Sequence, residues 1–356
     1  MFQYILFICV TRLRGERTVS GIYHLLTGKR SSQSLQDSRS YRLDQFFGVY
    51  PSLNRERFQQ YFEKAEREGF IVINNNQYPV ITEKGKVVVQ QYKDHNFYFD
   101  GMKKHQSIQM FEERVFLLIQ TTTNIHINNY TFLPVTDHKK IQNWVKKAYF
   151  RHQKDLTLYV RKLYEEIDGL LSHRPVLEAE LFTYRLTGGP VIGLTRDQLA
   201  KKFAVEKEEV DIKIHHLFYY FYHQIDSQRE RYPLLYQCIA DLKPSTLITH
   251  SAKRTYELLE QGDSIKEISA KRNLKESTIQ DHVVEAALVI PDFSIDRFID
   301  VQDQRFIVDQ LKQLKTMKLK TIYEALEGQY SYFTLRLVLA SVQQSSEERR
   351  GNYAKP

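Results

Sequence analysis

The side chains best suited to recognising a ligand lie close together between residues 271 and 280, in the stretch KRNLKESTIQ. Serine, threonine and glutamine can exchange hydrogen bonds with the edges of DNA bases, and lysine and arginine hold phosphates. The candidate nucleic-acid contacts in this stretch are Lys271, Arg272, Lys275, Ser277, Thr278 and Gln280. They can act together only if a helix presents them, so the flanking sequence must supply that helix.

The flanking sequence has the helix boundaries of a helix-turn-helix. A helix predicted over 253–261 ends at Gly262, because glycine readily takes the left-handed conformation found at helix ends. Ser264 and Glu267 form a capping box that begins the next helix, and Asn273 ends it. The stretch is therefore a compact unit of three short helices.

The third helix is the one that could enter a DNA groove. It begins at Glu276 or Ser277, and its apolar stripe is formed by Ile279, Val283 and Ala286. The unit over 243–287 holds seven basic and seven acidic residues, and Asp281 and Glu285 would repel phosphates. Base readout by this helix and a role in packing or protein docking therefore both stay open.

These residues carry a resemblance to a known family. The stretch GDSIKEISAKRNLKESTIQDHVVEA, with SIDRFI and LKTIYEALEGQYSYFTLRLVLA after it, resembles the helicase helix-turn-helix domain at the C-termini of some RecQ-type helicases. A longer resemblance, to YpbB-like bacterial proteins, includes GERTVSGIYHLLTGKRSSQSLQD, FLLIQTTTNIHINNY and LTGGPVIGLTRDQLA. Such proteins are usually encoded beside a RecQ-type helicase gene. The resemblance implies that this protein acts together with that helicase on DNA. It does not imply a set of catalytic residues.

Composition is consistent with a nucleic-acid partner. The chain has 356 residues, a net charge of +8 and 42% hydrophobic residues, enough for two or three folded domains. Cys9 and Cys238 lie far apart without histidine or cysteine neighbours, so neither a disulfide framework nor a metal site is expected. No apolar run reaches the ~18 residues of a membrane-spanning helix. We expect a cytoplasmic protein without a membrane segment or a cofactor.

The N-terminal region, 1–94, has the pattern of a winged helix. After a first buried helix, helices are predicted near 19–26, over 35–47 and over 54–68, followed by strands 70–73 and 78–81 around Asn74, Asn75 and Asn76. The outer face of the third of these helices offers Arg55, Gln59 and Gln60 as nucleic-acid contacts. A winged helix that only packs on its neighbours remains the alternative.

The middle region, 101–226, is the most basic part of the chain. Residues 101–164 hold eleven lysines and arginines against four acids. Its candidate phosphate contacts are Lys139, Lys140, Lys146, Lys147 and Arg151. Trp144 shares a helical stripe with Ile141, Val145 and Ala148, so it is better explained as core than as a base-stacking platform.

A second helix-turn-helix is predicted over 195–219. At a constant offset of 69 residues, Thr195 and Gln198 align with the capping box of Ser264 and Glu267, and the apolar positions also correspond. The last helix of this copy carries four acids, Glu206, Glu208, Glu209 and Asp211, which makes groove insertion improbable. We interpret the copy as a scaffold. His215, His216 and His223 lack further ligands at metal spacing and indicate an ordinary helix face.

The sequence predicts no enzyme. Residues 188–195, GGPVIGLT, lack the lysine of a phosphate-binding loop, and no nucleophile elbow or zinc-binding helix is present. We therefore expect a mainly α protein with an N-terminal winged helix-turn-helix and small β wing, a helical middle, a helix-turn-helix domain over 244–340, and a disordered tail over 341–356. The predicted function is a non-catalytic DNA-binding accessory protein that partners a RecQ-type DNA helicase in repair or recombination. A sequence-specific transcription regulator using Thr278 and Gln280, and a protein–protein adaptor without DNA contact, remain alternatives.

Overall fold

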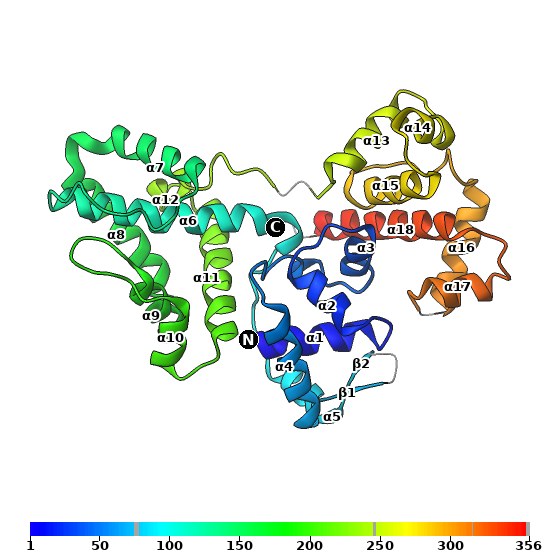
Figure 1. Cartoon of the computed structure of the whole chain (residues 1–356), viewed down its shortest axis with the longest axis horizontal. Coiled ribbons are helices and arrows are strands. Elements are labelled where there is room, and N and C mark those ends of the chain that lie inside the picture. The colour runs from blue at the N-terminus through cyan, green and yellow to red at the C-terminus, as the bar shows by residue number, and fades with distance from the viewer. Residues whose placement is uncertain (75–77, 245–246, 315, 354–356) are drawn as a thin grey trace. The chain divides into compact units, whose positions relative to one another are not determined.

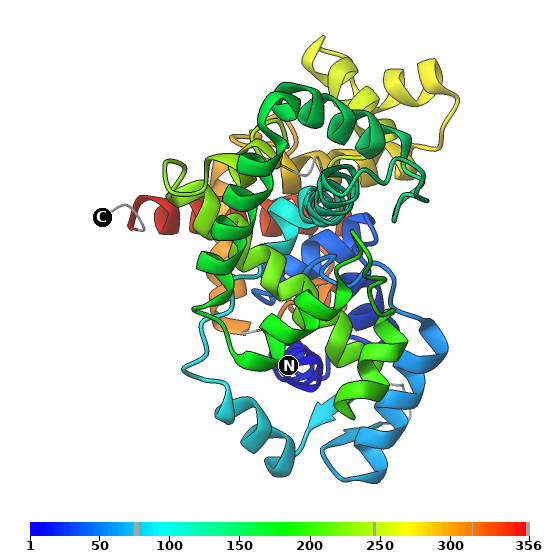
Figure 2. The same ribbon diagram turned by 90° about the vertical axis from the view of Figure 1, so that its left-hand side faces the viewer.

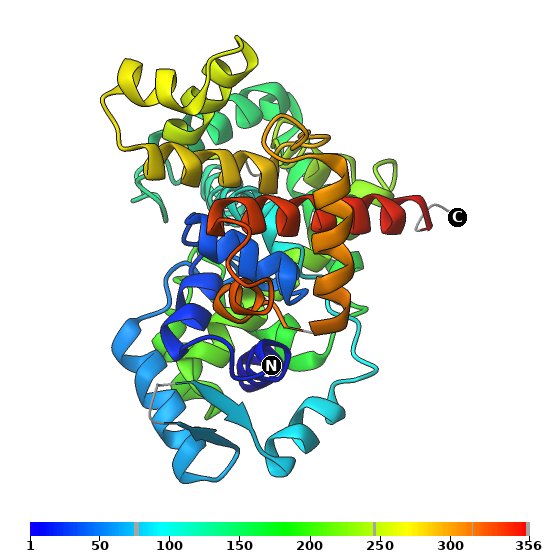
Figure 3. The same ribbon diagram turned by 90° about the vertical axis from the view of Figure 1, so that its right-hand side faces the viewer.

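The computed structural model describes residues 1–74, 78–244, 247–314 and 316–353 (Figure 1). The described chain is mainly α-helical and contains one antiparallel sheet of two short strands, which confirms the predicted fold class (Figures 2 and 3). No helix in this part of the chain has the length and apolar character needed to span a bilayer. The chain divides into two compact units, each assembled from separate segments of sequence.

The first unit comprises Met1–Leu6, Gly48–Leu53 and Val89–Ser245. It contains the beginning of α1 (Phe2–Leu13) and the end of α5 (Glu83–Gln91). Its other helices are α6 (Gly101–His126), α7 (Lys139–His152), η2 (Gln153–Asp155), α8 (Leu156–Leu171), α9 (Val176–Arg185), α10 (Arg196–Phe203), α11 (Lys207–Ser227) and α12 (Pro233–Gln237). α11 is central because it packs on α6, α9, α10 and α12. Its core is aromatic: the rings of Phe111, Phe116, Phe182 and Phe221 all lie within 6.0 Å of the ring of Phe218.

The second unit comprises Phe7–Phe47, Asn54–Val88 and Thr246–Pro356. It contains the remainders of α1 and α5. Its other elements are α2 (Val19–Leu26), α3 (Ser32–Ser40), η1 (Asp44–Phe46), α4 (Arg55–Arg67), β1 (Ile71–Ile73), β2 (Pro79–Ile81), α13 (His250–Glu260), α14 (Ile265–Arg272), α15 (Glu276–Val289), α16 (Val301–Leu314), α17 (Leu319–Ala325) and α18 (Tyr332–Tyr353).

The predicted domain boundaries differ from these units. The sequence indicated separate domains over 1–94 and 244–340, but α15 packs on α3 and α18 as well as on α13 and α14 (Figures 1 and 3). The second half of α15 is apolar on nearly all sides, with Val283, Val284 and Leu288 fully buried. A helix of that kind needs neighbours all round, and α3 supplies one of them.

The hairpin lies where the sequence placed it. β1 and β2 pair antiparallel, with Ile71 opposite Ile81 and Ile73 opposite Pro79. Thr82 then begins the closing helix, because its hydroxyl accepts the main-chain N–H of Gly85 at 3.2 Å. A Cβ at Gly85 would lie 2.3 Å from the carbonyl oxygen of Phe70, so only glycine fits there. Of the predicted asparagine tip, Asn75 and Asn76 lie outside the described residues.

The polar helix predicted over 35–47 is shorter and lies earlier. α3 begins at Ser32, where the hydroxyl of Ser31 accepts the N–H of Ser34 at 3.2 Å, and it ends at Ser40. Its polar side chains Gln36 and Asp37 are buried, and Asp37 pairs with Arg17 at 2.8 Å. Apolar periodicity missed these boundaries because this helix buries polar side chains, of which Asp37 and Ser38 are hydrogen-bonded.

The C-terminal segment also differs from the prediction. The sequence indicated a disordered tail over 341–356, but α18 continues through this stretch as far as Tyr353. Its residues SVQQSSEERR contain no proline and several good helix formers, so helix propensity favours continuation. Residues 354–356 lie outside the described part of the chain.

Candidate nucleic-acid interface

The C-terminal helix-turn-helix has the local geometry predicted for it. The Ser264 hydroxyl accepts the N–H of Glu267 at 3.3 Å, and the Glu267 carboxylate accepts the N–H of Ser264 at 2.7 Å, which completes the capping box. α14 then ends at Asn273 in the left-handed conformation, with φ 51°. Ile268 and Ile279 are fully buried, so the two short helices share a core with α13.

The amino-terminal end of α15 is its accessible part. Lys275 and Ser277 are exposed, Thr278 and Gln280 are half-buried, and from Val283 to Leu288 every residue is buried. Recognition helices usually contact bases through their first residues, and this is the part that α15 can present. The rest of α15 packs in the hydrophobic core of the unit.

The two basic residues in the last turn of α14, Lys271 and Arg272, already have partners. Lys271 forms an ion pair with Asp263 at 2.6 Å. Arg272 donates to the carbonyl oxygen of Ser251 at 2.8 Å, to the Ser251 hydroxyl at 2.9 Å and to the Thr255 hydroxyl. Arg272 therefore ties α14 to α13, and its guanidinium is committed within the unit.

The two acids expected to repel phosphates have different surroundings. Glu285 is buried and accepts the main-chain N–H of Thr249, the residue that caps α13; the expectation that it lies near a bound backbone was wrong. Burial raises the pKa of Glu285, against the opposing hydrogen bonds from Thr249. Asp281 is exposed but pairs with Arg336 of α18 at 2.5 Å, which offsets its charge.

The predicted contacts on α4 lie together in the second unit. Arg55, Gln59 and Gln60 are exposed and line a groove of about 580 Å³. Arg55 donates to the Ser20 hydroxyl at 3.2 Å and lies over the ring of Tyr23. Two carboxylates, Glu56 and Glu63, line the same groove, so its charge is mixed.

The basic residues of α7 form a continuous exposed face. α7 packs on α6 through the buried stripe of Ile141, Val145 and Ala148, as predicted. Its opposite side carries the cations, all exposed: Lys139, Lys140, Lys146, Lys147 and Arg151. The helix contains no acid, and no ion pair to these five cations is found among the described residues. We call these five residues the α7 basic face.

An aromatic side chain lies on the α7 basic face. Phe150 is 51% exposed, and the ammonium group of Lys146 lies 6.0 Å from its ring centre. Trp144 is instead half-buried beneath the guanidinium of Arg114, 4.5 Å from its ring. The sequence analysis did not single out Phe150, although its position two residues after Ala148 places it opposite the apolar stripe.

The stretch predicted as a second helix-turn-helix has helix ends that correspond to those of the C-terminal unit. Thr195 and Gln198 complete a capping box, and α10 ends at Ala204 with φ 52°, the counterpart of Asn273. α11 begins at Lys207, which is 69 residues before the first residue of α15. The core positions also match, since Leu199 and Val210 are fully buried like Ile268 and Ile279.

Three of the four acids in this copy are committed to structure. Asp211 is buried and binds Arg196 at 2.9 Å, Lys207 at 2.7 Å and the hydroxyl of Tyr50. Glu208 is buried, and Glu209 binds the amino group of Met1 at 2.9 Å. These contacts are consistent with the scaffold role predicted for the copy.

The remaining candidate for chemistry was the histidine cluster on α11. His216 is buried, lies 3.8 Å from Glu178 and accepts the main-chain N–H of Tyr98 at 3.3 Å. Burial lowers its pKa against the opposing effect of Glu178. Within the described residues, no group of three histidines, cysteines or acids is arranged to hold a metal. Cys9 and Cys238 are buried thiols whose burial raises the pKa of each to about 12.

Comparisons with known proteins agree with this arrangement. Residues 251–339 match the model of a family described as a helix-turn-helix domain. The chain is 29% identical over 342 residues to protein YpbB of Bacillus subtilis (strain 168), covering 95% of this chain and 96% of the relative. No solved structure matches the chain. The predicted resemblance is therefore confirmed: the chain is similar to protein YpbB over nearly its whole length and carries a helix-turn-helix domain at its carboxyl end.

Proposed function

We propose that this protein is a non-catalytic, cytoplasmic DNA-binding accessory factor that works with a RecQ-type DNA helicase in repair or recombination. The helix-turn-helix domain supports the DNA-binding part of the proposal. The resemblance to YpbB-like proteins, which are usually encoded beside such a helicase, motivates the choice of partner.

The observation that carries the DNA-binding proposal is the α7 basic face. Its cations are exposed and make no ion pair among the described residues, so they remain available to phosphates. The helix rises about 1.5 Å per residue, and residues 139–151 therefore offer charge along roughly 18 Å of backbone. Phe150 adds a surface on which an unpaired base can stack. In the helix-turn-helix, by contrast, Lys271 and Arg272 already have protein partners.

The salt dependence of binding tests this proposal. Log affinity of the full chain for DNA should fall linearly with log salt, because each neutralised phosphate releases counterions. Replacing Lys139, Lys140, Lys146 and Lys147 with alanine should shallow that slope by about three units. A matched control replaces four exposed lysines elsewhere in the first unit, Lys93, Lys103, Lys201 and Lys243. Equal changes of slope in both variants would reject the α7 basic face as the contact surface.

The helicase partnership needs a separate test. Truncation before residue 243 would remove α15 and α18 from α3 and so disturb the core of the second unit. Point substitutions at the N-cap and in the first turn of α15, Lys275→Glu and Ser277→Glu, change its surface with less risk to the fold. We expect nuclease-resistant co-purification of the full chain with the helicase and loss of the complex in this double variant. Absence of any complex with the unaltered chain would contradict the partnership.

One observation favours a protein adaptor as the second candidate. The helix-turn-helix unit is neutral, and α15 exposes Glu276 and Asp281 beside its polar residues. Such a surface suits a protein partner better than a phosphate backbone. If the protein is an adaptor, the full chain should bind the helicase and show no measurable affinity for DNA. Absence of DNA binding at every salt concentration of the titration would favour this function.

A further inference from the structure

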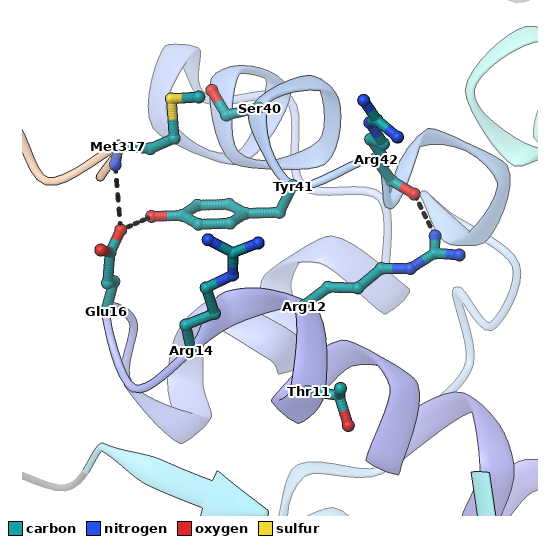
Figure 4. A pocket seen from close by; sticks show the side chains of 8 residues that line it. All are labelled: Thr11, Arg12, Arg14, Glu16, Ser40, Tyr41, Arg42 and Met317. Carbon is teal, nitrogen blue, oxygen red and sulfur yellow. Dashed lines mark hydrogen bonds between the residues drawn. The ribbon is translucent and has the colours of Figure 1, made fainter. Parts of the chain in front are cut away.

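A polar pocket in the second unit has no place in the proposed function. Its volume is about 570 Å³, within the ~300–1,000 Å³ range of small-ligand sites. It lies where the end of α1 meets the end of α3 and the segment before α17 (Figure 4). The lining residues are Thr11, Arg12, Arg14, Glu16, Ser40, Tyr41, Arg42 and Met317. We call it the three-arginine pocket.

Two of these arginines occupy backbone positions that disfavour their side chains. Arg14 directly follows α1 with φ 52°, and Arg42 follows the end of α3 with φ 57°. Both values lie in the left-handed region, where glycine or asparagine is the usual residue. Conformations of this kind persist where the surroundings enforce them, and they cluster at functional sites. Arg12 helps to hold Arg42 in this backbone conformation, because the Arg12 guanidinium donates a hydrogen bond to the carbonyl oxygen of Arg42.

The positive charge of the pocket is largely uncompensated. No ion pair to Arg12, Arg14 or Arg42 is found in the described part of the chain. The one carboxylate on the lining, Glu16, accepts from the Tyr41 hydroxyl at 2.6 Å, the Thr316 hydroxyl at 2.6 Å and the N–H of Met317 at 3.2 Å. Although burial opposes ionisation, these hydrogen bonds hold the pKa of Glu16 below its usual value. Three arginines thus line the pocket together with one carboxylate whose oxygens are occupied.

The basic end of α1 has an ordinary explanation that covers only part of this geometry. A cation in the last turn of a helix is favoured by the helix dipole, and Arg12 satisfies that condition. The dipole of α1 does not explain why Arg42, from another segment, lines the same pocket as Arg14. Figure 4 shows the Arg14 side chain between Glu16 and Arg12, with the main chain of Arg42 beyond.

We propose that the three-arginine pocket binds the phosphate group of a phosphorylated ligand, with Arg14 and Arg42 as the contacting residues and Arg12 as a positioning residue. Guanidinium groups present paired N–H donors that match phosphate oxygens and make short, charge-assisted hydrogen bonds. The volume exceeds that of a bare phosphate and admits a mononucleotide. The phosphate can belong to a free nucleotide or to the end of a nucleic-acid strand, and the two sources give different results below.

The positive φ angles of Arg14 and Arg42 allow two variants that remove a guanidinium group without straining the backbone. Arg14→Gly and Arg42→Gly each remove the guanidinium and place the residue best suited to a positive φ. Neither substitution should unfold the protein, and the melting temperature without ligand should stay the same or rise. Arg305→Ala, at an exposed position of α16, is the control for loss of one arginine.

Calorimetric titration of the full chain with dAMP, deoxyadenosine and inorganic phosphate is the first arm of the experiment. We expect dAMP and phosphate to bind, deoxyadenosine not to bind, and each glycine variant to lose about tenfold or more in affinity. The Arg305→Ala variant should bind as the unaltered chain does. This outcome, without a 5′-phosphate preference in the second arm, identifies a free phosphorylated ligand as the source.

Oligonucleotide binding is the second arm. If the phosphate belongs to a strand end, a 5′-phosphorylated oligonucleotide binds more tightly than its 5′-hydroxyl counterpart, and the Arg14→Gly, Arg42→Gly double variant erases the difference. The alanine variant of the α7 basic face should retain the 5′-phosphate preference, which separates this inference from the proposed function. No binding of dAMP or phosphate together with no 5′-phosphate preference overturns it. So does any such binding that survives in the double glycine variant.

Discussion

Ala204 and Asn273 hold the same left-handed backbone conformation, with φ 52° and 51°, at corresponding ends of α10 and α14. Each residue ends the second helix of a helix-turn-helix and lets the chain turn into the third. Asparagine tolerates this conformation because its side chain forms local hydrogen bonds, whereas alanine carries the full steric cost of its Cβ. The backbone at Ala204, in the copy formed by α10 and α11, is therefore strained, and a substitution can relieve this strain.

Replacing Ala204 with glycine should stabilise the protein. The steric cost removed exceeds the extra chain entropy of glycine, and we expect a gain of about 0.5–1 kcal/mol in the free energy of unfolding. Denaturant titration of the full chain measures it. Ala179→Gly, inside α9, should instead cost roughly 0.5–1 kcal/mol. A loss of stability at both positions would show that the turn after α10 does not need the left-handed conformation.

Glu112 should make the first unit sensitive to acid. Its carboxylate pairs with Arg196, and His215 Nδ1 lies 3.2 Å away. Burial would raise its pKa, but these neighbours outweigh burial and lower the pKa to about 2. Because the folded value lies below the unfolded one, Glu112 contributes stability above about pH 4.5, and this is lost as the pH falls toward 2.

The matched variant for this prediction is Glu112→Gln. It should cost about 3 kcal/mol of unfolding free energy at pH 7, and the difference from the unaltered chain should shrink below pH 4.5. Glu165→Gln is the control, since Glu165 is 63% exposed and lies 3.9 Å from Arg161. A cost for Glu112→Gln that is independent of pH would mean that packing, and not the charge, stabilises this position.

Phe150 should contribute to binding in a way that salt does not change. Phe150→Ala removes a stacking surface worth roughly 1–3 kcal/mol per base, so affinity for single strands should fall about fivefold or more. The slope of log affinity against log salt should stay unchanged, because no charge is lost. Fluorescence anisotropy with single-stranded and duplex DNA measures both quantities. An equal loss on duplex DNA would point to a structural effect and contradict base stacking.

Alanine substitutions of the adjacent residues Arg272 and Lys271 should lower the stability of the protein by different amounts. Arg272 holds Ser251 and Thr255 of α13, so Arg272→Ala should cost about 1–3 kcal/mol of stability in the second unit. Lys271→Ala loses only a surface ion pair and should cost under about 1 kcal/mol. Thermal unfolding measures both. If Arg272→Ala left stability intact and weakened DNA binding, the guanidinium would be a DNA contact as the sequence first indicated.

The difference between these two residues shows what the sequence could and could not supply. Capping boxes, helix ends and apolar stripes depend on a few neighbouring residues, and Ser264, Asn273 and Ile279 were placed correctly for that reason. The partner of a long polar side chain depends on which helices meet. Nothing in the local pattern around Glu285 distinguishes an exposed acid from one that caps α13. Likewise Arg14 and Arg42 belong to distant segments, so their shared pocket has no local signal.

The packing of α3 on α15 is the largest difference from the predicted domains. It predicts that the two helices unfold together, as parts of one cooperative core. Leu35 of α3 is fully buried in the second unit, and its replacement by alanine should cost about 2–5 kcal/mol. If α3 and α15 belong to one cooperative core, amide hydrogen exchange should accelerate in both helices of Leu35→Ala by a similar factor. Leu181→Ala, in α9 of the other unit, is the matched core substitution. Faster exchange confined to residues 1–94 would mean that the N-terminal region is an independent domain after all. Faster exchange in α13 and α15 as well would mean that the helix-turn-helix depends for its stability on a helix more than two hundred residues earlier in the chain.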